Sequence, residues 1–216
     1  MYSIKRHIEG VVERRSKNSK AILLTGPRQV GKSTLYKHLF GKVNQVTFDD
    51  DLLLAQAEED MNLFLLNNPC PLMIDEVQKC PSIFNKLKIV LDNTDEYGNF
   101  YLTGSQKLQL MEGVSESLAG RVSIVELEGL SLREIYDVPF SKHFVPTQEY
   151  IKEREGAVKN YRKNLWETIH RGSYPELYSN PKREWMDFYQ SYVKTYLESD
   201  VNKLIRAKNH LTFVKF

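Results

Sequence analysis

One stretch of nine residues constrains the fold of this chain more than any other feature. It fits the pattern G-x-x-x-x-G-K-[ST] and consists of Gly26, Pro27, Arg28, Gln29, Val30, Gly31, Lys32, Ser33 and Thr34. The apolar run 21–25 before it predicts a buried strand, and the apolar spacing over 32–40 predicts a helix. The alternative is a glycine-containing turn before an ordinary helix. The flanking strand and helix favour a loop that binds phosphate.

The residue types in this stretch suit phosphate oxygens. Gly26 and Gly31 let the backbone curl tightly and approach an anion without a Cβ atom in the way. The curled loop turns backbone N–H groups inward, and the helix adds its unpaired N-terminal N–H groups. We expect Lys32 to reach the β- and γ-phosphates and the Ser33 hydroxyl to bind Mg²⁺.

A second stretch, residues 71–76, is an apolar run that ends in Asp75 and Glu76. Buried parallel strands have this pattern when functional residues lie at their carboxyl ends. Asp75 is predicted to orient Mg²⁺ through its water shell, and Glu76 to polarise the water that attacks the γ-phosphate. Taken alone, the pattern is better explained by a strand that ends in two solvated acids. Its place after the phosphate-loop pattern, in a chain that alternates strands and helices, favours the functional interpretation.

Polar residues also end the next predicted strand. Thr103 and Ser105 are candidates to touch the γ-phosphate or the attacking water. For Ser105, capping of a helix that begins at Gln106 is an equally good explanation. Arg121 stands just before the last predicted strand. It either reaches a γ-phosphate, in its own subunit or in a neighbour's, or forms a plain surface salt bridge.

The remaining patterns complete an alternating strand–helix chain. The predicted strands are 21–25, 43–48, 71–75, 100–102 and 122–127. The acidic triplet 49–51 either caps a helix over 51–66 or helps to hold Mg²⁺. Pro81 opens the next helix at its favoured first position, and a capping box over 131–134 opens a short one. We predict an α/β fold, a doubly wound, mostly parallel five-stranded sheet with helices on both faces, whose site lies at the strand C-termini.

After residue 136 the alternation of predicted strands and helices ends. Residues 137–156 are polar and carry a charge run, so they are interpreted as a linker or inserted loop between a first domain, 1–136, and a helical region, 157–216. One helix is predicted around Trp166 and a long one after Pro181, whose aromatic stripe is either core or a stacking platform for nucleic acid. The final residues carry no helix stop signal, so the second domain is expected to continue past residue 216.

Composition and charge limit the partners and the cellular compartment that can be expected. The 216 residues carry a formal net charge of +2, which gives no global argument for a nucleic-acid partner. A helix predicted over 3–16 is locally basic, either as a solvated face or as a patch for nucleic acid or for adenine and phosphate. Its basic residues, with those just after it, are Lys5, Arg6, Arg14, Arg15, Lys17 and Lys20. No apolar run is long enough to span a membrane, and no signal peptide is expected. Cys70 and Cys80 are interpreted as structural thiols of a cytoplasmic protein.

With both sites placed, the chain resembles the prokaryotic AAA-type ATP-binding proteins that carry a C-terminal domain of unknown function. The resemblance covers nearly the whole chain. It is carried by residues 26–34, 73–78 (Met-Ile-Asp-Glu-Val-Gln), 102–105 (Leu-Thr-Gly-Ser), 118–121 (Leu-Ala-Gly-Arg), 172–175 (Gly-Ser-Tyr-Pro) and 196–201 (Tyr-Leu-Glu-Ser-Asp-Val). The loop with its Gly-Pro-Arg-Gln opening and the Leu-Ala-Gly-Arg stretch are the more specific parts.

The resemblance implies a P-loop NTPase core with an extra central strand between the phosphate-loop strand and the Asp-Glu strand. It implies ATP with Mg²⁺, Lys32 on phosphate, Ser33 and Asp75 on the metal, and Glu76 as water activator. Arg121 matches the position of a sensor or finger, and a finger serving a neighbour implies a homo-oligomer. The absence of an Asn-Lys-x-Asp guanine reader also favours ATP.

Two functions follow from the sequence. The first is an ATP hydrolase that acts as a conformational switch. The second is a nucleotide-gated binding module with little turnover, in which ATP positions the helices after residue 157 to grip DNA or a partner protein. The two differ in whether turnover or occupancy is the output.

Overall fold

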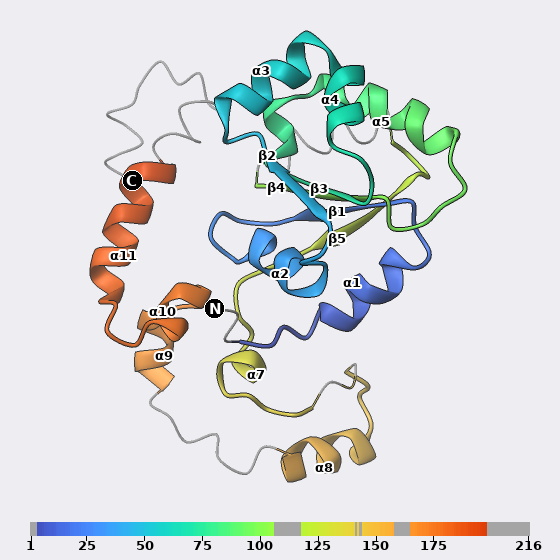
Figure 1. The fold of residues 1–216 in the computed structure, drawn as a ribbon. Helices are drawn as coiled ribbons and strands as arrows, with labels where there is room; N and C mark the ends of the chain where they lie inside the picture. The colour runs from blue at the N-terminus through green and yellow to red at the C-terminus, as the bar shows by residue number, and fades with distance from the viewer. Residues whose placement is uncertain (1–3, 106–117, 141, 143, 158–164, 198–216) are drawn as a thin grey trace, which may run out of the picture. The chain divides into compact units, whose positions relative to one another are not determined.

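A computed structural model describes residues 4–105, 118–140, 142, 144–157 and 165–197 (Figure 1). Its contacts divide the chain into two compact units, Met1–Tyr161 and Arg162–Phe216. Each unit is described by itself. In the described part of the chain, no helix combines the length and the apolar character needed to cross a bilayer.

The first unit is built on a five-stranded sheet in which every pairing is parallel. Its strands are β1 (Ala21–Thr25), β2 (Asn44–Thr47), β3 (Leu72–Asp75), β4 (Phe100–Gly104) and β5 (Val122–Glu126). Their order across the sheet is β2-β3-β4-β1-β5. Strand β4 therefore lies between β1 and β3, as the resemblance implies, and the predicted doubly wound sheet is confirmed.

The register of the strands places their carboxyl ends at one edge of the sheet. Thr25 of β1 is level with Gly104 of β4 and Glu126 of β5. Asp75 is level with Thr47 at the ends of β3 and β2. The segments that follow β1, β3 and β4 therefore start beside one another, which is where ligands bind in open sheets of this kind.

Helices cover both faces of this sheet (Figure 1). On one face lie α3 (Asp51–Glu59), α4 (Met61–Asn67) and α5 (Ser82–Asp92); on the other lie α1 (Glu9–Ser16) and α2 (Lys32–Leu39). Alternate strand residues such as Leu23, Ile74 and Leu102 join the helices of the first face in one buried apolar cluster. On the other face the Tyr36 ring of α2 meets the Tyr101 ring of β4 edge-on, with 5.6 Å between their centroids.

The single helix predicted over 51–66 is wrong, because the chain breaks at Asp60. The backbone of Asp60 is extended, with φ −143° and ψ 93°. Its carboxylate accepts hydrogen bonds from the N–H groups of Asn62 and Leu63, at 2.9 and 3.0 Å, and so caps α4 as a new helix. Asp50 caps α3 in the same way, which confirms the capping interpretation of the acidic triplet.

The helix predicted over 3–16 is also too long, since α1 begins only at Glu9. The residues just before it make other hydrogen bonds. The Arg6 N–H donates to the Glu9 carboxylate at 2.6 Å, and the His7 N–H donates to Oε1 of Glu134 at 2.8 Å. Tertiary hydrogen bonds therefore fix this segment outside the helix, and the Arg6 side chain is buried rather than part of an exposed basic face.

After β5, the described residues of the first unit form two more helices. The predicted capping box is confirmed: Ser131 and Glu134 exchange hydrogen bonds at the start of α7 (Leu132–Ile135). Part of the stretch interpreted as a linker is the helix α8 (Gln148–Ala157). Its Tyr150 is buried with Val138 and Phe140, so this stretch has a small apolar cluster of its own.

The second unit is helical over its described residues, 165–197. It contains α9 (Leu165–Arg171), α10 (Pro175–Ser179), α11 (Trp185–Tyr192) and a π-helical turn, η2 (Val193–Leu197). The long helix predicted from Pro181 starts later, at Trp185. Phe188 of α11 is buried and its ring lies 5.2 Å from that of Tyr174, so at least this part of the aromatic stripe is core.

Candidate functional site

The loop after β1 curls as its glycines require. Gly26, Gln29 and Gly31 all have positive φ, at 142°, 61° and 93°. Residues of opposite backbone hand that follow one another turn successive N–H groups toward one point, which makes an anion-binding nest. A Cβ atom on Gly26 would lie 2.0 Å from the carbonyl oxygen of Leu127, so only glycine fits where the loop begins.

Lys32, the first residue of α2, folds back over this loop. Its ammonium donates to the carbonyl oxygens of Gly26 at 3.0 Å and Pro27 at 2.7 Å. Burial lowers the pKa of Lys32, and the nearby carboxylates of Glu76 and Asp75 oppose that shift. A buried cation therefore spans a nest of N–H groups, which is an arrangement that favours a bound anion.

Asp75, at the end of β3, is held by two hydroxyl groups. Ser33 of α2 donates to its Oδ2 at 2.6 Å, and Thr103 of β4 donates to its Oδ1. The three side chains come from three different elements, and all of them lie at the carboxyl edge of the sheet. The predicted metal pair, Ser33 and Asp75, is therefore brought into direct contact.

These donors suit a magnesium ion. Mg²⁺ prefers oxygen ligands, keeps several waters, and needs only one or two carboxylates when phosphates supply the rest. Across the described ranges, no group of three or more His, Cys, Asp or Glu side chains is arranged for a metal. The Ser33 hydroxyl and the Asp75 carboxylate, converging beside a phosphate-type loop, fit the sparse donor set of a nucleotide-bound Mg²⁺.

Glu76 follows Asp75 in a left-handed conformation, with φ 56°. Its Oε2 accepts hydrogen bonds from the Ser105 hydroxyl at 3.0 Å and from the Gln78 amide. The Gln78 amide also contacts Ser105 at 3.4 Å, so the three side chains close a triangle. A non-glycine residue held at positive φ stores local strain, and such residues gather at functional sites.

Gln78 is the residue of this triangle whose role the sequence does not predict. It is the last residue of the Met-Ile-Asp-Glu-Val-Gln stretch. A side-chain amide two positions after a candidate general base is a signal that could identify such a residue. A short turn after the strand brings that amide back beside the carboxylate. That turn is η1 (Val77–Lys79).

Most of the predicted site residues thus meet at one edge. Ser33 and Thr103 bond to Asp75, and Ser105 bonds to Glu76. The charge of Lys32 interacts with both carboxylates. Arg28, Gln29 and Val30 belong to the loop itself, where Val30 is buried, and Thr34 is exposed on the first turn of α2. The helix that Ser105 was predicted to cap lies outside the described residues.

The structure does not bring Arg121 to this cluster within one chain. Arg121 precedes Val122, which is level with Ala21 at the amino ends of β5 and β1, so it lies at the opposite edge of the sheet. Its guanidinium pairs with both carboxylate oxygens of Asp92, at 2.5 and 3.1 Å. A hydrogen bond from Arg121 lowers the pKa of Asp92. The salt bridge anticipated as one alternative is therefore present.

A parallel sheet with a glycine-rich loop after β1 and an Asp-Glu pair after a strand separated from β1 by one other defines a P-loop nucleotide-binding domain. Comparison with protein families agrees. Residues 18–136, more than half of the chain, match the family described as AAA domain. The chain belongs to this family of AAA-type P-loop ATPases. Residues 162–216 match a domain of unknown function, DUF8612.

Two curated relatives match about half of the chain. They are uncharacterized protein Mb2031c of Mycobacterium bovis and uncharacterized protein Rv2008c of Mycobacterium tuberculosis. Each is 38% identical over 115 residues, which is 53% of this chain and 26% of the relative. The match therefore spans about a quarter of the relatives' own length.

One solved structure shares the fold. The Walker-type ATPase paby2304 of Pyrococcus abyssi has a TM-score of 0.53 at 16% identity, covering 95% of this chain and 77% of its own. A RuvB variant of Thermotoga maritima has a TM-score of 0.43 at 18% identity, covering 62% of this chain and 49% of its own.

Proposed function

We propose that the chain binds ATP together with Mg²⁺ and hydrolyses it, and that the change of nucleotide state acts as a conformational switch. One observation carries this proposal: Ser33, Asp75 and Glu76 lie together beside the loop that Lys32 spans. The proposal assigns phosphate binding, metal binding and water activation to these groups at one edge of one sheet.

Nucleotide binding falls to the loop and to Lys32. The inward N–H groups and the N-terminus of α2 receive the phosphate oxygens. The Lys32 ammonium, which donates to the Gly26 and Pro27 carbonyls, exchanges these acceptors for oxygens of the β- and γ-phosphates. Hydrogen bonds between charged groups are stronger than bonds to neutral carbonyls, so the exchange favours the bound state.

Ser33 and Asp75 hold the metal in this proposal. Mg²⁺, when bound, supplies positive charge that neutralises the phosphates. Thr103 keeps the Asp75 carboxylate oriented through its hydrogen bond to Oδ1. The other oxygen, Oδ2, therefore stays directed at Ser33. Thr103 is fully buried, and its hydroxyl also accepts a hydrogen bond from the Glu76 N–H at 3.4 Å.

Glu76 acts as the general base. Its carboxylate accepts a proton from the water that attacks the γ-phosphorus, while the bond to the leaving ADP oxygen breaks. Ser105 and Gln78 hold the carboxylate in place through Oε2. Because Oε2 carries both of these bonds, Oε1 is the oxygen that we assign to the water.

Arg121 completes the site from a neighbouring subunit. Within its own chain it lies at the amino edge of the sheet, opposite the phosphate loop. A subunit packed with that edge against the next subunit's loop would present Arg121 to a γ-phosphate. In this proposal the guanidinium exchanges its pairing with Asp92 for the neighbour's γ-phosphate, and the assembly is a homo-oligomer.

Binding of mant-ATP and release of phosphate from ATP, each with and without Mg²⁺, test the proposal. We expect saturable binding and Mg²⁺-dependent phosphate release in the wild type, and loss of both in Lys32→Met. Wild-type protein that binds no nucleotide, or a Lys32→Met variant that binds equally well, would overturn it.

A further inference from the structure

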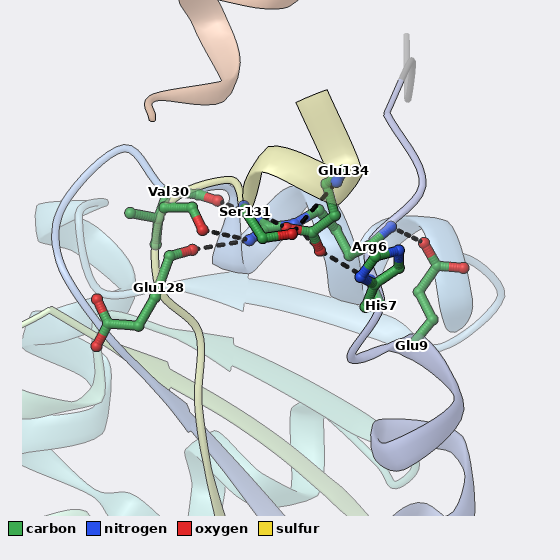
Figure 2. Close-up of polar contacts among 8 residues, drawn as sticks. Arg6, His7, Glu9, Val30, Glu128, Ser131 and Glu134 are labelled. Carbon is green, nitrogen blue, oxygen red and sulfur yellow. Dashed lines mark hydrogen bonds and ion pairs between the residues drawn. The ribbon is translucent and has the colours of Figure 1, made fainter. Parts of the chain in front are cut away.

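Arg6 lies buried between the amino-terminal segment, the phosphate loop and the segment after β5. Only 5% of the residue is exposed. Its Nη1 donates to the Val30 carbonyl oxygen at 2.9 Å, and its Nη2 donates to the Glu128 carbonyl oxygen at 2.7 Å. Its Nε donates to Oε1 of Glu134 at 3.1 Å (Figure 2). Every nitrogen of this guanidinium thus bonds to a different part of the chain.

A buried arginine needs a reason, because removing a charge from water is costly unless it is paired and hydrogen-bonded. Glu134 supplies the opposite charge and is itself held tightly. Its carboxylate accepts from the Ser131 N–H at 2.7 Å and the His7 N–H at 2.8 Å (Figure 2). The ion pair therefore has a fixed position, and it sits against the loop that we assign to phosphate.

The bond to Val30 acts on the geometry of the loop. A peptide unit is planar and trans, so its C=O and N–H groups point in opposite directions. The Val30 carbonyl shares its peptide unit with the Gly31 N–H. By holding that carbonyl, Arg6 directs the Gly31 N–H away from itself. In the proposed site this N–H belongs to the nest that receives phosphate.

The other end of the loop rests on the same neighbouring segment. The space beside Gly26 is filled by the backbone of Leu127. Arg6 links the Val30 end of the loop to Glu128 and, through Nη2 at 3.3 Å, to Gly129. Residues 127–129 therefore contact the loop directly at its start and through Arg6 near its end.

We propose that Arg6 is a positioning residue of the nucleotide site, which holds the Val30–Gly31 peptide in its phosphate-binding orientation and joins the loop to residues 128–134. This inference rests on the proposed nucleotide binding. Through the same bonds, a change in the loop on nucleotide binding or release passes to Glu128 and Glu134, in the segment that follows β5 along the chain.

The test compares Arg6→Met and Arg6→Lys with Arg15→Met in the full chain. Arg15 is a suitable control because it also donates to a backbone carbonyl, that of Ile124 at 2.5 Å, but from an exposed position at the end of α1. Mant-ADP affinity gives the binding readout. The KM and kcat for ATP separate positioning from chemistry, and circular dichroism reports folding.

We expect Arg6→Met to weaken mant-ADP binding and raise KM by about 10- to 100-fold, the range for losing hydrogen bonds to a charged group, with kcat changed less than about threefold. Arg6→Lys restores part of the loss, since an ammonium keeps the charge but cannot reach all of the acceptors. Arg15→Met stays within about twofold of the wild type.

Each outcome bears on a different claim. If the wild-type protein binds no nucleotide, the proposed function itself is overturned. Wild-type binding together with a folded Arg6→Met variant of equal affinity overturns only the role of Arg6. If Arg6→Met does not fold, Glu134→Gln takes its place, because it removes the countercharge and keeps the side-chain shape. A weakening of binding by about fivefold then supports the inference, and unchanged affinity overturns it.

Discussion

The hydroxyl of Ser33 donates to Oδ2 of Asp75 across 2.6 Å, although 42 positions separate the two residues in the chain. Ser33 lies in the first turn of α2 and Asp75 at the end of β3. The contact exists because parallel strands end at a common edge and because β4 alone separates β3 from the strand that leads into the loop. It joins the two sequence stretches on which the nucleotide site depends.

This contact predicts how the metal enters binding. We expect Asp75→Asn and Ser33→Ala to leave Mg²⁺-free mant-ADP binding within about twofold and to remove most of the tightening that Mg²⁺ produces. Removing one ligand of the ion is expected to weaken Mg²⁺-dependent binding by about tenfold. Isothermal titration with and without Mg²⁺ measures both values. Equal Mg²⁺ dependence in wild type and Asp75→Asn would contradict the assignment.

The buried charge of Lys32 is expected to lower the stability of the nucleotide-free protein. Its pKa is lowered by burial, so the folded protein binds its proton less tightly than the unfolded chain does. Stability from this group therefore rises with pH as the folded pKa is passed. We expect Lys32→Met, which fills the space without a charge, to raise the nucleotide-free Tm by about 2–4 °C, corresponding to about 1 kcal/mol. Differential scanning calorimetry without nucleotide measures this, and a clearly lower Tm would count against it.

Arg121 offers a choice between a surface salt bridge and a finger for a neighbour. If it serves a neighbour, Arg121→Ala lowers kcat by about 10³-fold or more, and Asp92→Ala, which breaks the same pair, does not. Mixing Arg121→Ala with Lys32→Met subunits then restores part of the turnover, because intact loops meet intact arginines. Phosphate release from the mixture measures this. Equal effects of Arg121→Ala and Asp92→Ala, without recovery on mixing, would leave only the salt bridge.

Glu134 predicts how the first unit responds to acid. Burial raises its pKa, but hydrogen bonds from the Ser131 and His7 N–H groups and the charge of Arg6 outweigh this, so the pKa is lowered. The corresponding stability is present above the unfolded value, about 4.3, and is lost as the pH falls through the lower folded pKa. We expect the wild type to lose more Tm than Glu134→Gln between about pH 5 and pH 3. Parallel curves for the two proteins would show that Glu134 does not contribute.

The sequence predicted the central elements well because their signals are local. The strand before the loop was predicted over 21–25, and β1 spans Ala21–Thr25. The capping box at Ser131 and Glu134 is a pattern of adjacent backbone groups, and it is present. Asp60, where the predicted helix breaks, is also a local capping signal. The apolar spacing continues on both sides of Asp60, so the sequence pattern predicts one helix instead of two.

The parts that the sequence did not predict depend on contacts distant along the chain. Arg6 belongs to a basic stretch, and nothing near it shows that it will be buried against Val30 and Glu134. Arg121 belongs to the Leu-Ala-Gly-Arg motif, but only the strand register shows that it lies at the opposite edge of the sheet from the phosphate loop. The role of Gln78 beside Glu76 depends on the turn that follows β3.

The most direct test of the proposed function is steady-state ATP turnover with Mg²⁺ in the wild type and in Glu76→Gln, with mant-ATP binding measured in parallel. Glutamine keeps the size of the side chain and its hydrogen bonding to Ser105 but cannot accept the proton. We expect equal binding within about twofold and a fall in kcat of about 10²- to 10⁴-fold, the usual contribution of a general base. Turnover by Glu76→Gln at the wild-type rate, or tight binding without turnover in either protein, would contradict the account.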